Sequence, residues 1–164
     1  MKDADAVELE SAMVCLSVVG DLSMGQPTDQ SRRAARLAQW LAQACDGAGE
    51  HIEVARQVSL LRWSGCTANA EDFMRLLGDD VAGRNAMLSQ TLGPAGLRAM
   101  RKTAPQAQVH CEVAGDIAQT LGLSAPVELG LRHVFEQFDG EGRPGGLRHG
   151  LRRSLRLPRC RSGI

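Results

Sequence analysis

Apolar residues recur along most of the chain at intervals of three and four positions, which is the period of an α-helix with one buried face. No stretch alternates between apolar and polar residues as a half-buried strand would. The pattern therefore predicts an all-α bundle of about seven or eight helices. The predicted helices cover residues 5–19, 29–45, 50–63, 70–77, 79–92, 94–101, 106–121 and 125–138.

Residues that cap helices stand at several of these boundaries. Thr28 or Asp29 can cap the second helix, because a side-chain oxygen there accepts a hydrogen bond from a free backbone N–H. Asn69 is placed to cap a short helix that ends before Gly78, and glycine readily adopts the left-handed conformation of a helix end. Ser124 is expected to cap the last helix.

The composition indicates a core made of aliphatic side chains. Of the 164 residues, 43% are hydrophobic but only 3% are aromatic, and tyrosine is absent. The length suits a single domain that can bury a core. The five cysteines are odd in number and lack metal-ligand spacing, so we expect reduced, buried thiols. No apolar run approaches a membrane span and the N-terminus is acidic, which predicts a cytoplasmic protein without a membrane segment.

Charge is balanced overall but unevenly distributed. All 19 acidic residues lie at or before Glu141, whereas the last 22 residues contain seven arginines and no acid. An acidic main body argues against nucleic-acid binding, except through the Arg-rich tail of residues 148–164. We interpret residues 1–147 as the domain and residues 148–164 as a disordered or weakly helical tail. The origin that we favour for this tail is an out-of-frame extension of the coding sequence.

The segment 134–147 combines an apolar, helix-like beginning with a loop that contains four glycines and a proline. Because glycine permits unusual φ angles and proline fixes φ, this composition predicts a tight turn defined by its backbone. The loop, residues 139–147, reads Asp-Gly-Glu-Gly-Arg-Pro-Gly-Gly-Leu. It resembles the Asp-Gly-x-Gly-Tyr-Pro-x-Gly-Leu loop of the HD-GYP phosphodiesterases, with Arg143 in the place of the tyrosine. Glu136 keeps the acid that precedes this loop in the family, whereas Val134 and Phe135 replace two histidines.

Three further segments are similar to the same family, so that the resemblance covers roughly residues 8–147. Segment 58–66 resembles the one that carries the family's His-Asp pair, which is Arg62-Trp63 here. Segment 27–34 resembles the one with the first histidine ligand, with Gln30 in its place, and segment 109–114 keeps a histidine as His110. The amino-acid sequences of segments 21–27, 65–70 and 110–114 most resemble the HD-like N-terminal domain of some LuxR-type transcriptional regulators.

The resemblance implies an HD-domain-like bundle, truncated at its C-terminus, and a family activity that needs a di-metal centre of Fe, Mn or Zn. Two metals would generate hydroxide and neutralise phosphoryl charge. Only His110, Glu136 and Asp139 remain as metal-ligand positions, and Arg62 would place a cation where the metals belong. We therefore expect no cofactor and no catalytic residue. Arg62 is hypothesised to pair with a surviving carboxylate and to occupy the vacated site.

Each remnant ligand also has a purely structural interpretation. His110 can be a hydrogen-bonded residue near a helix start, and Asp139 can be a turn residue that binds nearby backbone N–H groups. Glu136 can be exposed or paired with an arginine.

Three functions follow as expectations. The first is a catalytically degenerate HD-GYP-like domain that serves as a sensory or protein-interaction module in bacterial signalling or transcription, with a homodimer or a regulatory protein as its partner. The second is a residual metal-dependent phosphodiesterase acting on a cyclic dinucleotide, and the third is a truncated remnant without a function of its own.

Overall fold

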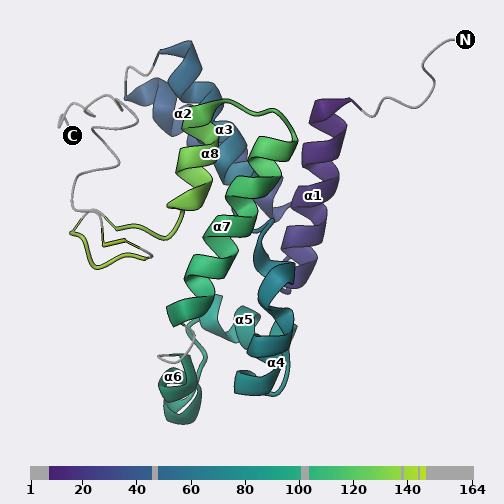
Figure 1. The fold of residues 1–164 in the computed structure, drawn as a ribbon, viewed down its shortest axis with the longest axis vertical. Helices are drawn as coiled ribbons and strands as arrows, with labels where there is room; N and C mark the ends of the chain where they lie inside the picture. The colour runs from purple at the N-terminus through teal and green to yellow at the C-terminus, as the bar shows by residue number, and fades with distance from the viewer. Residues whose placement is uncertain (1–7, 46–47, 101–103, 138, 144, 147–164) are drawn as a thin grey trace, which may run out of the picture.

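The computed structural model describes residues 8–45, 48–100, 104–137, 139–143 and 145–146, and these residues form helices and loops without a strand. The all-α prediction is therefore confirmed. Figure 1 shows an elongated bundle in which α1 and α7 run along the long axis, α2, α3 and α8 lie towards one end, and α4, α5 and α6 lie at the other. The α-helices are α1 (Leu9–Ser23), α2 (Gln30–Ala44), α3 (Gly49–Leu61), α4 (Ala70–Leu77), α5 (Asp80–Leu88), α6 (Pro94–Met100), α7 (Ala104–Thr120) and α8 (Ala125–Arg132), and the 3₁₀-helix η1 (Cys66–Asn69) connects α3 to α4.

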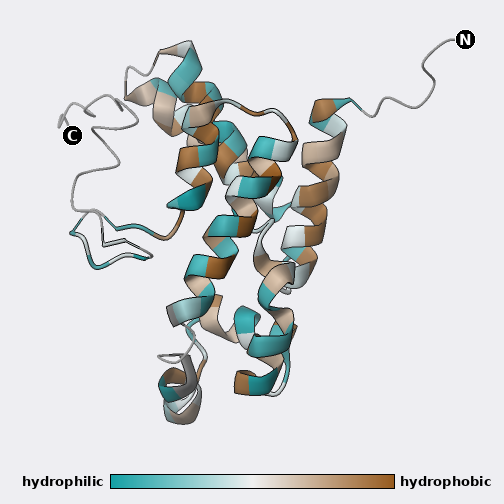
Figure 2. Cartoon of the chain, in the orientation of Figure 1, coloured by the Kyte–Doolittle hydropathy of each residue, from teal (hydrophilic) through white to brown (hydrophobic). Residues whose placement is uncertain are grey.

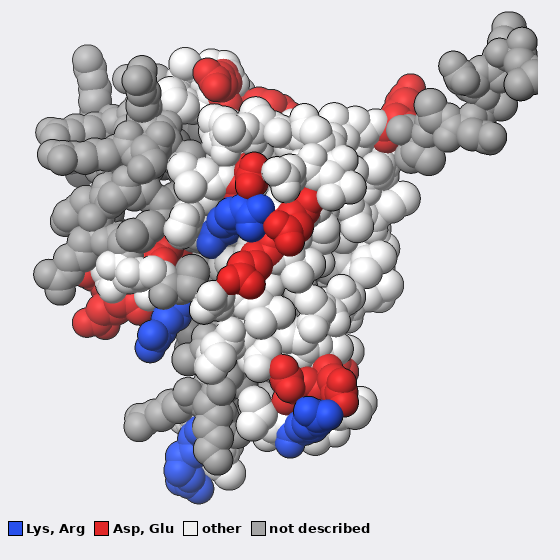
Figure 3. Space-filling model, in the orientation of Figure 1, with Lys and Arg blue, Asp and Glu red and all other residues white. Residues whose placement is uncertain are grey.

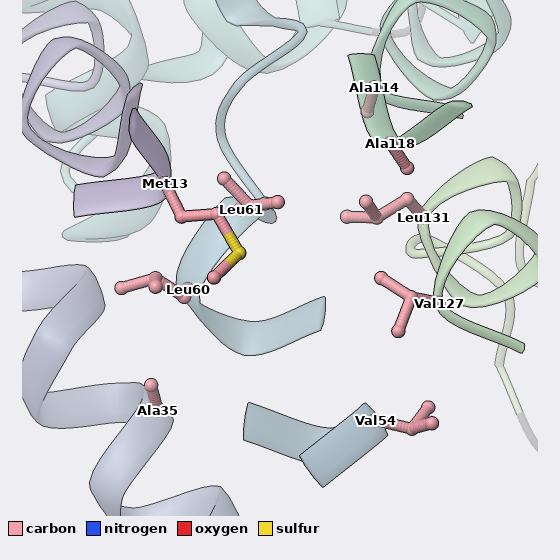
Figure 4. Packing of buried hydrophobic residues seen from close by; sticks show 9 residues of the cluster. All are labelled: Met13, Ala35, Val54, Leu60, Leu61, Ala114, Ala118, Val127 and Leu131. Carbon is pink, nitrogen blue, oxygen red and sulfur yellow. The ribbon is translucent and has the colours of Figure 1, made fainter. Parts of the chain in front are cut away.

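The core forms where α3 lies against its neighbours. Leu61 of α3 and Leu131 of α8 are completely buried (Figure 4). Figure 2 shows apolar and polar residues alternating around the helices, as expected for helices that bury one face. Every member of the core cluster is aliphatic or methionine, as the composition predicts: Met13, Ala35, Val54, Leu60, Leu61, Ala114, Ala118, Val127 and Leu131.

The junction of α1 and α2 differs from the prediction. Helix α1 continues to Ser23, through residues that the sequence pattern assigns to a loop, and Asp29 makes no capping hydrogen bond with its side chain. The carboxylate of Asp21 caps α2 instead: its oxygens accept hydrogen bonds from the Ser31 backbone N–H (3.0 and 3.1 Å) and from the Ser31 hydroxyl (2.6 Å). Both residues are fully buried. The cap is ten residues away in sequence, so no local pattern could reveal it.

Helix α8 is shorter than predicted, because it ends at Arg132 and not near residue 138. The following loop folds back on this segment: the Arg143 N–H donates to the Phe135 carbonyl (3.0 Å) and the Gly145 N–H donates to the Glu136 carboxylate (2.5 Å). Gly140 has a φ of 84°, which agrees with the predicted tight turn. These tertiary contacts compete with further helix formation after Arg132.

Helix α5 also ends earlier than predicted, at Leu88 and not at residue 92, whereas the boundary between α4 and α5 agrees better with the sequence. Gly78 ends α4 with a φ of 84°, and the carboxylate of Asp79 caps α5 through the Ala82 N–H (2.8 Å). Asn69 and Ser124 stand at the predicted boundaries, but neither makes a side-chain capping bond.

The cysteines follow the prediction only in part. Cys66 and Cys111 are free and buried, Cys15 is free but exposed, and Cys45 is disulfide-bonded, contrary to the expectation of reduced thiols. The predicted tail, residues 148–164, lies outside the described residues. None of the described helices combines the length and the apolar character needed to cross a membrane.

Charged side chains on the face in Figure 3 form small groups of mixed sign, separated by uncharged surface. Arg132 pairs with Asp116 (2.8 Å) and Glu128 (2.9 Å), and Arg75 pairs with Glu71 (2.5 Å). Such exposed pairs contribute little to stability. The described part of this face carries no extended basic patch.

Candidate functional site

The structure brings together three of the four sequence segments that resemble HD-GYP proteins. The ring of Trp63, just after α3, lies 6.4 Å from the ring of His110 in α7 and 6.2 Å from the ring of Phe135 after α8. The rings of His110 and Phe135 are 4.7 Å apart. Three positions that the resemblance assigns to metal-ligand segments therefore form an aromatic cluster around one histidine.

His110 is 2% exposed, and both of its ring nitrogens face other groups. Nε2 lies 2.8 Å from the Arg62 carbonyl oxygen, which can only accept, so Nε2 carries the proton. Nδ1 is then an acceptor and lies 3.5 Å from the Sγ of Cys66. The pKa of His110 is lowered to about 4: burial is the main cause, the Arg62 carbonyl opposes the shift, and the charge of Arg84 adds to it. His110 is a neutral imidazole at pH 7.

The Cys66–His110 contact does not form a nucleophilic pair. Burial raises the pKa of the Cys66 thiol to about 12, and the charge of Arg84 offsets this only in part. A nucleophilic cysteine needs its thiolate, usually beside a charged imidazole. Here the thiol and the imidazole are both neutral. The contact lies within the protein interior, where the Sγ of Cys66, which has a single thiol hydrogen, also lies 3.3 Å from the Sδ of Met24.

The pKa of His110 predicts that the protein loses stability in mild acid. The unfolded chain takes up a proton as pH falls through about 6.5, whereas folded His110 stays neutral down to about 4. The unfolded state therefore binds more protons in this window, and the free energy of unfolding should fall by about 3 kcal/mol between pH 7 and pH 4. Urea denaturation across this range should show the loss in wild type and a smaller loss in His110→Gln. His51→Gln serves as the control, and equal pH dependence in His110→Gln and wild type would refute the assignment.

Arg84 of α5 organises the other side of the cluster. Arg84 is 1% exposed, and its guanidinium donates to the carbonyl of Cys66 (2.8 Å), the side-chain oxygen of Asn69 (2.9 Å) and the carbonyl of Ser23 (3.1 Å). The carboxylate of Asp80 lies 3.5 Å away. A buried charge is tolerated only with such partners. Arg84 thereby joins the end of α1 to η1 and α5.

A pocket of about 380 Å³ lies between these groups. Most of the wall formed by described residues is apolar, and among these residues Arg84 is the only one with a full charge. Two polar atoms of lining residues, Nε1 of Trp63 and Oε1 of Gln106, are buried and have no hydrogen-bond partner. The lining residues are Met24, Trp63, Cys66, Asn69, Phe73, Arg84, Met87, Leu88, Gln106, Ala107, His110 and Phe135.

The other predicted ligand positions do not join His110. Glu136 accepts from the Gly145 N–H, and its side chain is 3% exposed, whereas Asp139 is exposed and accepts from the Glu141 N–H (2.9 Å). Both carboxylates thus hold the loop that follows α8. Within the described residues, no three His, Cys, Asp or Glu side chains come together as a metal site would require. His110 carries a proton on Nε2 and offers only Nδ1 as a lone pair, so the described residues do not fit a di-metal centre.

Arg62 does not behave as hypothesised. Among the described residues it forms no ion pair with Glu136 or Asp139, and its guanidinium lies 5.0 Å from the centre of the Trp63 ring. Burial lowers the pKa of Arg62, and the charge of Asp21 opposes this effect. Gln30, in the place of the family's first histidine, accepts from Arg33 (2.9 Å) and does not line the pocket.

Sequence reasoning missed Arg84, Asn69 and Gln106 as members of the site. Arg84 follows Asp80 by one helical turn, a spacing typical of a solvent-exposed pair. The sequence pattern predicts Asn69 as a helix cap, yet its side chain accepts from Arg84 and donates to the Gln106 carbonyl (3.0 Å). Only the placement of α5 and α7 against η1 brings these polar groups together.

Comparison with known proteins adds no relative: no family model, no curated protein and no solved structure matches the chain.

Proposed function

We propose that the chain is a catalytically degenerate HD-GYP-like domain that acts as a sensory or protein-interaction module in bacterial signalling or transcription. One observation carries the proposal. Trp63, His110 and Phe135 come from three segments that resemble the family's ligand segments, and they meet in one place with aromatic ring contacts. A convergence of this kind is expected if the resemblance reflects a common fold. The chemistry at this place suits binding better than hydrolysis.

The potential metal ligands in this cluster argue against metal-dependent hydrolysis. A two-metal hydrolase needs several imidazoles and carboxylates that converge on open coordination positions. Here one neutral histidine carries its proton on Nε2, which donates to the Arg62 carbonyl, and the carboxylates of Glu136 and Asp139 bind backbone N–H groups. Trp63 and Phe135 cannot donate a lone pair to a metal. The residual phosphodiesterase is therefore the weaker alternative.

An exposed apolar surface on α2 supports the interaction part of the proposal. Leu37, Trp40 and Leu41 are 55%, 63% and 66% exposed. Their spacing of three and four residues places them on one face of the helix. A contiguous apolar face of this kind is typical of a surface that contacts another protein. A second copy of the chain or a regulatory protein are the partners proposed.

The metal and activity test decides between the module and the enzyme. Purified protein is expected to contain far less than one equivalent of iron, manganese or zinc, and to leave cyclic dinucleotides intact after metal addition. Elemental analysis and chromatography of the nucleotide measure both. Near-stoichiometric metal that is lost in His110→Ala, together with hydrolysis, would overturn the proposal in favour of the phosphodiesterase.

The same purified protein tests the third function, a truncated remnant without a function of its own. A functional module is expected to unfold cooperatively in urea, with a slope typical of a domain of this size. A broad transition without a native baseline would favour the remnant. Intact cooperative unfolding without metal or hydrolysis is the result that we expect.

A further inference from the structure

We propose that the groove between α1, α2 and α3 binds an organic phosphate, a small molecule that joins a phosphate dianion to an apolar body. The groove has a volume of about 540 Å³ and shares no described lining residue with the pocket around His110. The ligand would lie outside the aromatic cluster, so its binding does not depend on the function proposed above. Three features point to it: the charges in the wall, the sequence of α2 and the apolar residues beneath these charges.

Each carboxylate in the described wall of the groove has an arginine partner. Both oxygens of Glu10 accept hydrogen bonds from Arg56 of α3, each at 2.9 Å. Arg56 also donates to Glu53 of its own helix (2.6 Å). The second carboxylate of the wall, Asp29, lies 3.4 Å from Arg33. Both carboxylates therefore stand beside a counter-charge before any ligand binds.

Arg32 and Arg36 supply further positive charge in the wall. Both are exposed, and neither forms a hydrogen bond or an ion pair with another described residue. They stand one helical turn apart on α2, so their side chains leave the same face of the helix. A guanidinium group binds a phosphate through two parallel N–H···O bonds, and two guanidinium groups suit a dianion.

The sequence of α2 places arginines where they oppose helix formation. The helix contains three arginines and no acid, and Arg32 stands in its first turn. The positive end of the helix dipole disfavours a cation there, and Arg32 and Arg36 repel each other across one turn. The buried carboxylate of Asp21 caps this end from inside the bundle, through Ser31. A phosphate dianion on the outer side would offset the repulsion between the arginines.

Apolar residues line the inner side of the groove and suit the body of the ligand. Leu60 and Ala35 are 2% and 4% exposed, and Val14 is half-buried. Gln39 lies in the wall three residues after Arg36 and offers its amide for a further hydrogen bond. A volume of about 540 Å³ lies within the usual range of small-molecule sites and exceeds what a free phosphate ion fills. An organic phosphate would use both the charges and the apolar side of the groove.

Three compounds test the ligand class by isothermal calorimetry on the full chain at pH 7. They are phenyl phosphate, which has the charge and an apolar body, inorganic phosphate, which lacks the body, and phenol, which lacks the charge. The second pKa of a phosphate ester is about 6, so phenyl phosphate is mostly a dianion at this pH. Phenyl phosphate should bind most tightly, and its affinity should fall as added salt screens the arginines. Equal binding of inorganic phosphate would mean an adventitious ion only, and equal binding of phenol or no binding of phenyl phosphate would likewise overturn the ligand class.

Matched variants locate the binding. Arg32→Gln and Arg36→Gln should each weaken phenyl phosphate binding about tenfold, and the double variant should abolish it. Arg75→Gln removes the same charge from α4, outside the groove, and should change the affinity by less than about twofold. Gln39→Glu places a carboxylate in the wall and should weaken binding about tenfold. Gln43→Glu makes the same change on α2 outside the described wall and should have a much smaller effect.

The stability of the ligand-free protein separates a binding role from a structural one. Because Arg32 opposes the helix dipole and repels Arg36, Arg32→Gln should leave the melting temperature unchanged or raise it. A clear fall would assign Arg32 a structural role and overturn its role in binding. Each variant is first shown to unfold cooperatively in urea. Phenyl phosphate binding that survives in a folded double variant would place the site elsewhere, for instance on the Arg-rich tail of residues 148–164, and would overturn the proposal.

Discussion

Arg84→Met is expected to destabilise the domain by about 3 kcal/mol, because methionine keeps much of the volume but removes every hydrogen bond of the guanidinium. The carbonyls of Ser23 and Cys66 and the side-chain oxygen of Asn69 would lose their donor, and Asp80 would lose its counter-charge. The guanidinium also lies 4.6 Å from the centre of the Phe73 ring. The lost hydrogen bonds join α1, η1 and α5, so the midpoint of the whole unfolding transition should shift.

Urea denaturation measures this effect through the midpoint at unchanged slope. Arg75→Met is the matched control, because Arg75 is also on a short helix and also paired one turn away, but its side chain is 68% exposed. The control should change the stability by less than about 0.5 kcal/mol. Arg84→Lys should recover only part of the loss, since lysine keeps the charge but not the planar fork. Similar midpoints for Arg84→Met and Arg75→Met would contradict the role of Arg84.

Gly65→Ala is expected to cost about 3 kcal/mol and to disturb the pocket. A Cβ at Gly65 would lie 2.2 Å from the carbonyl oxygen of His110 and 3.0 Å from its carbonyl carbon. Both atoms belong to the backbone of α7, so no side-chain rotation can relieve the overlap. The turn that precedes η1 would have to move apart from α7. This movement would take His110 away from Cys66 and the Arg62 carbonyl.

Thermal unfolding and the near-ultraviolet circular dichroism of the tryptophans measure this change. Gly49→Ala is the control, because a Cβ at Gly49 at the start of α3 meets nothing within 4 Å. Alanine also favours a helix more than glycine does, so the control should be unchanged or slightly more stable. A melting temperature for Gly65→Ala equal to that of the control would show that the approach of η1 to α7 is not as close as described.

The sequence by itself determined the helical class, the aliphatic core and several helix ends. Core positions such as Leu61 and Leu131 follow from the repeating apolar pattern, which sums a weak signal over many residues. The end of α4 at Gly78 follows from local backbone chemistry. The tight turn after residue 139 follows in the same way. The family resemblance, and with it the proposed function, stays a proposal that metal analysis and activity assays test.

Only the tertiary structure decided which polar residues are interior and what they do there. Asp21 caps a helix ten residues away, and Arg84 binds groups up to 61 residues away. The sequence pattern treats both as ordinary charged residues, because the partner that makes burial tolerable comes from another element. The same reason explains why α8 ends at Arg132 and why the pocket around His110 was not foreseen. Local periodicity specifies a helix and its apolar face, whereas the contacts between distant segments specify the site.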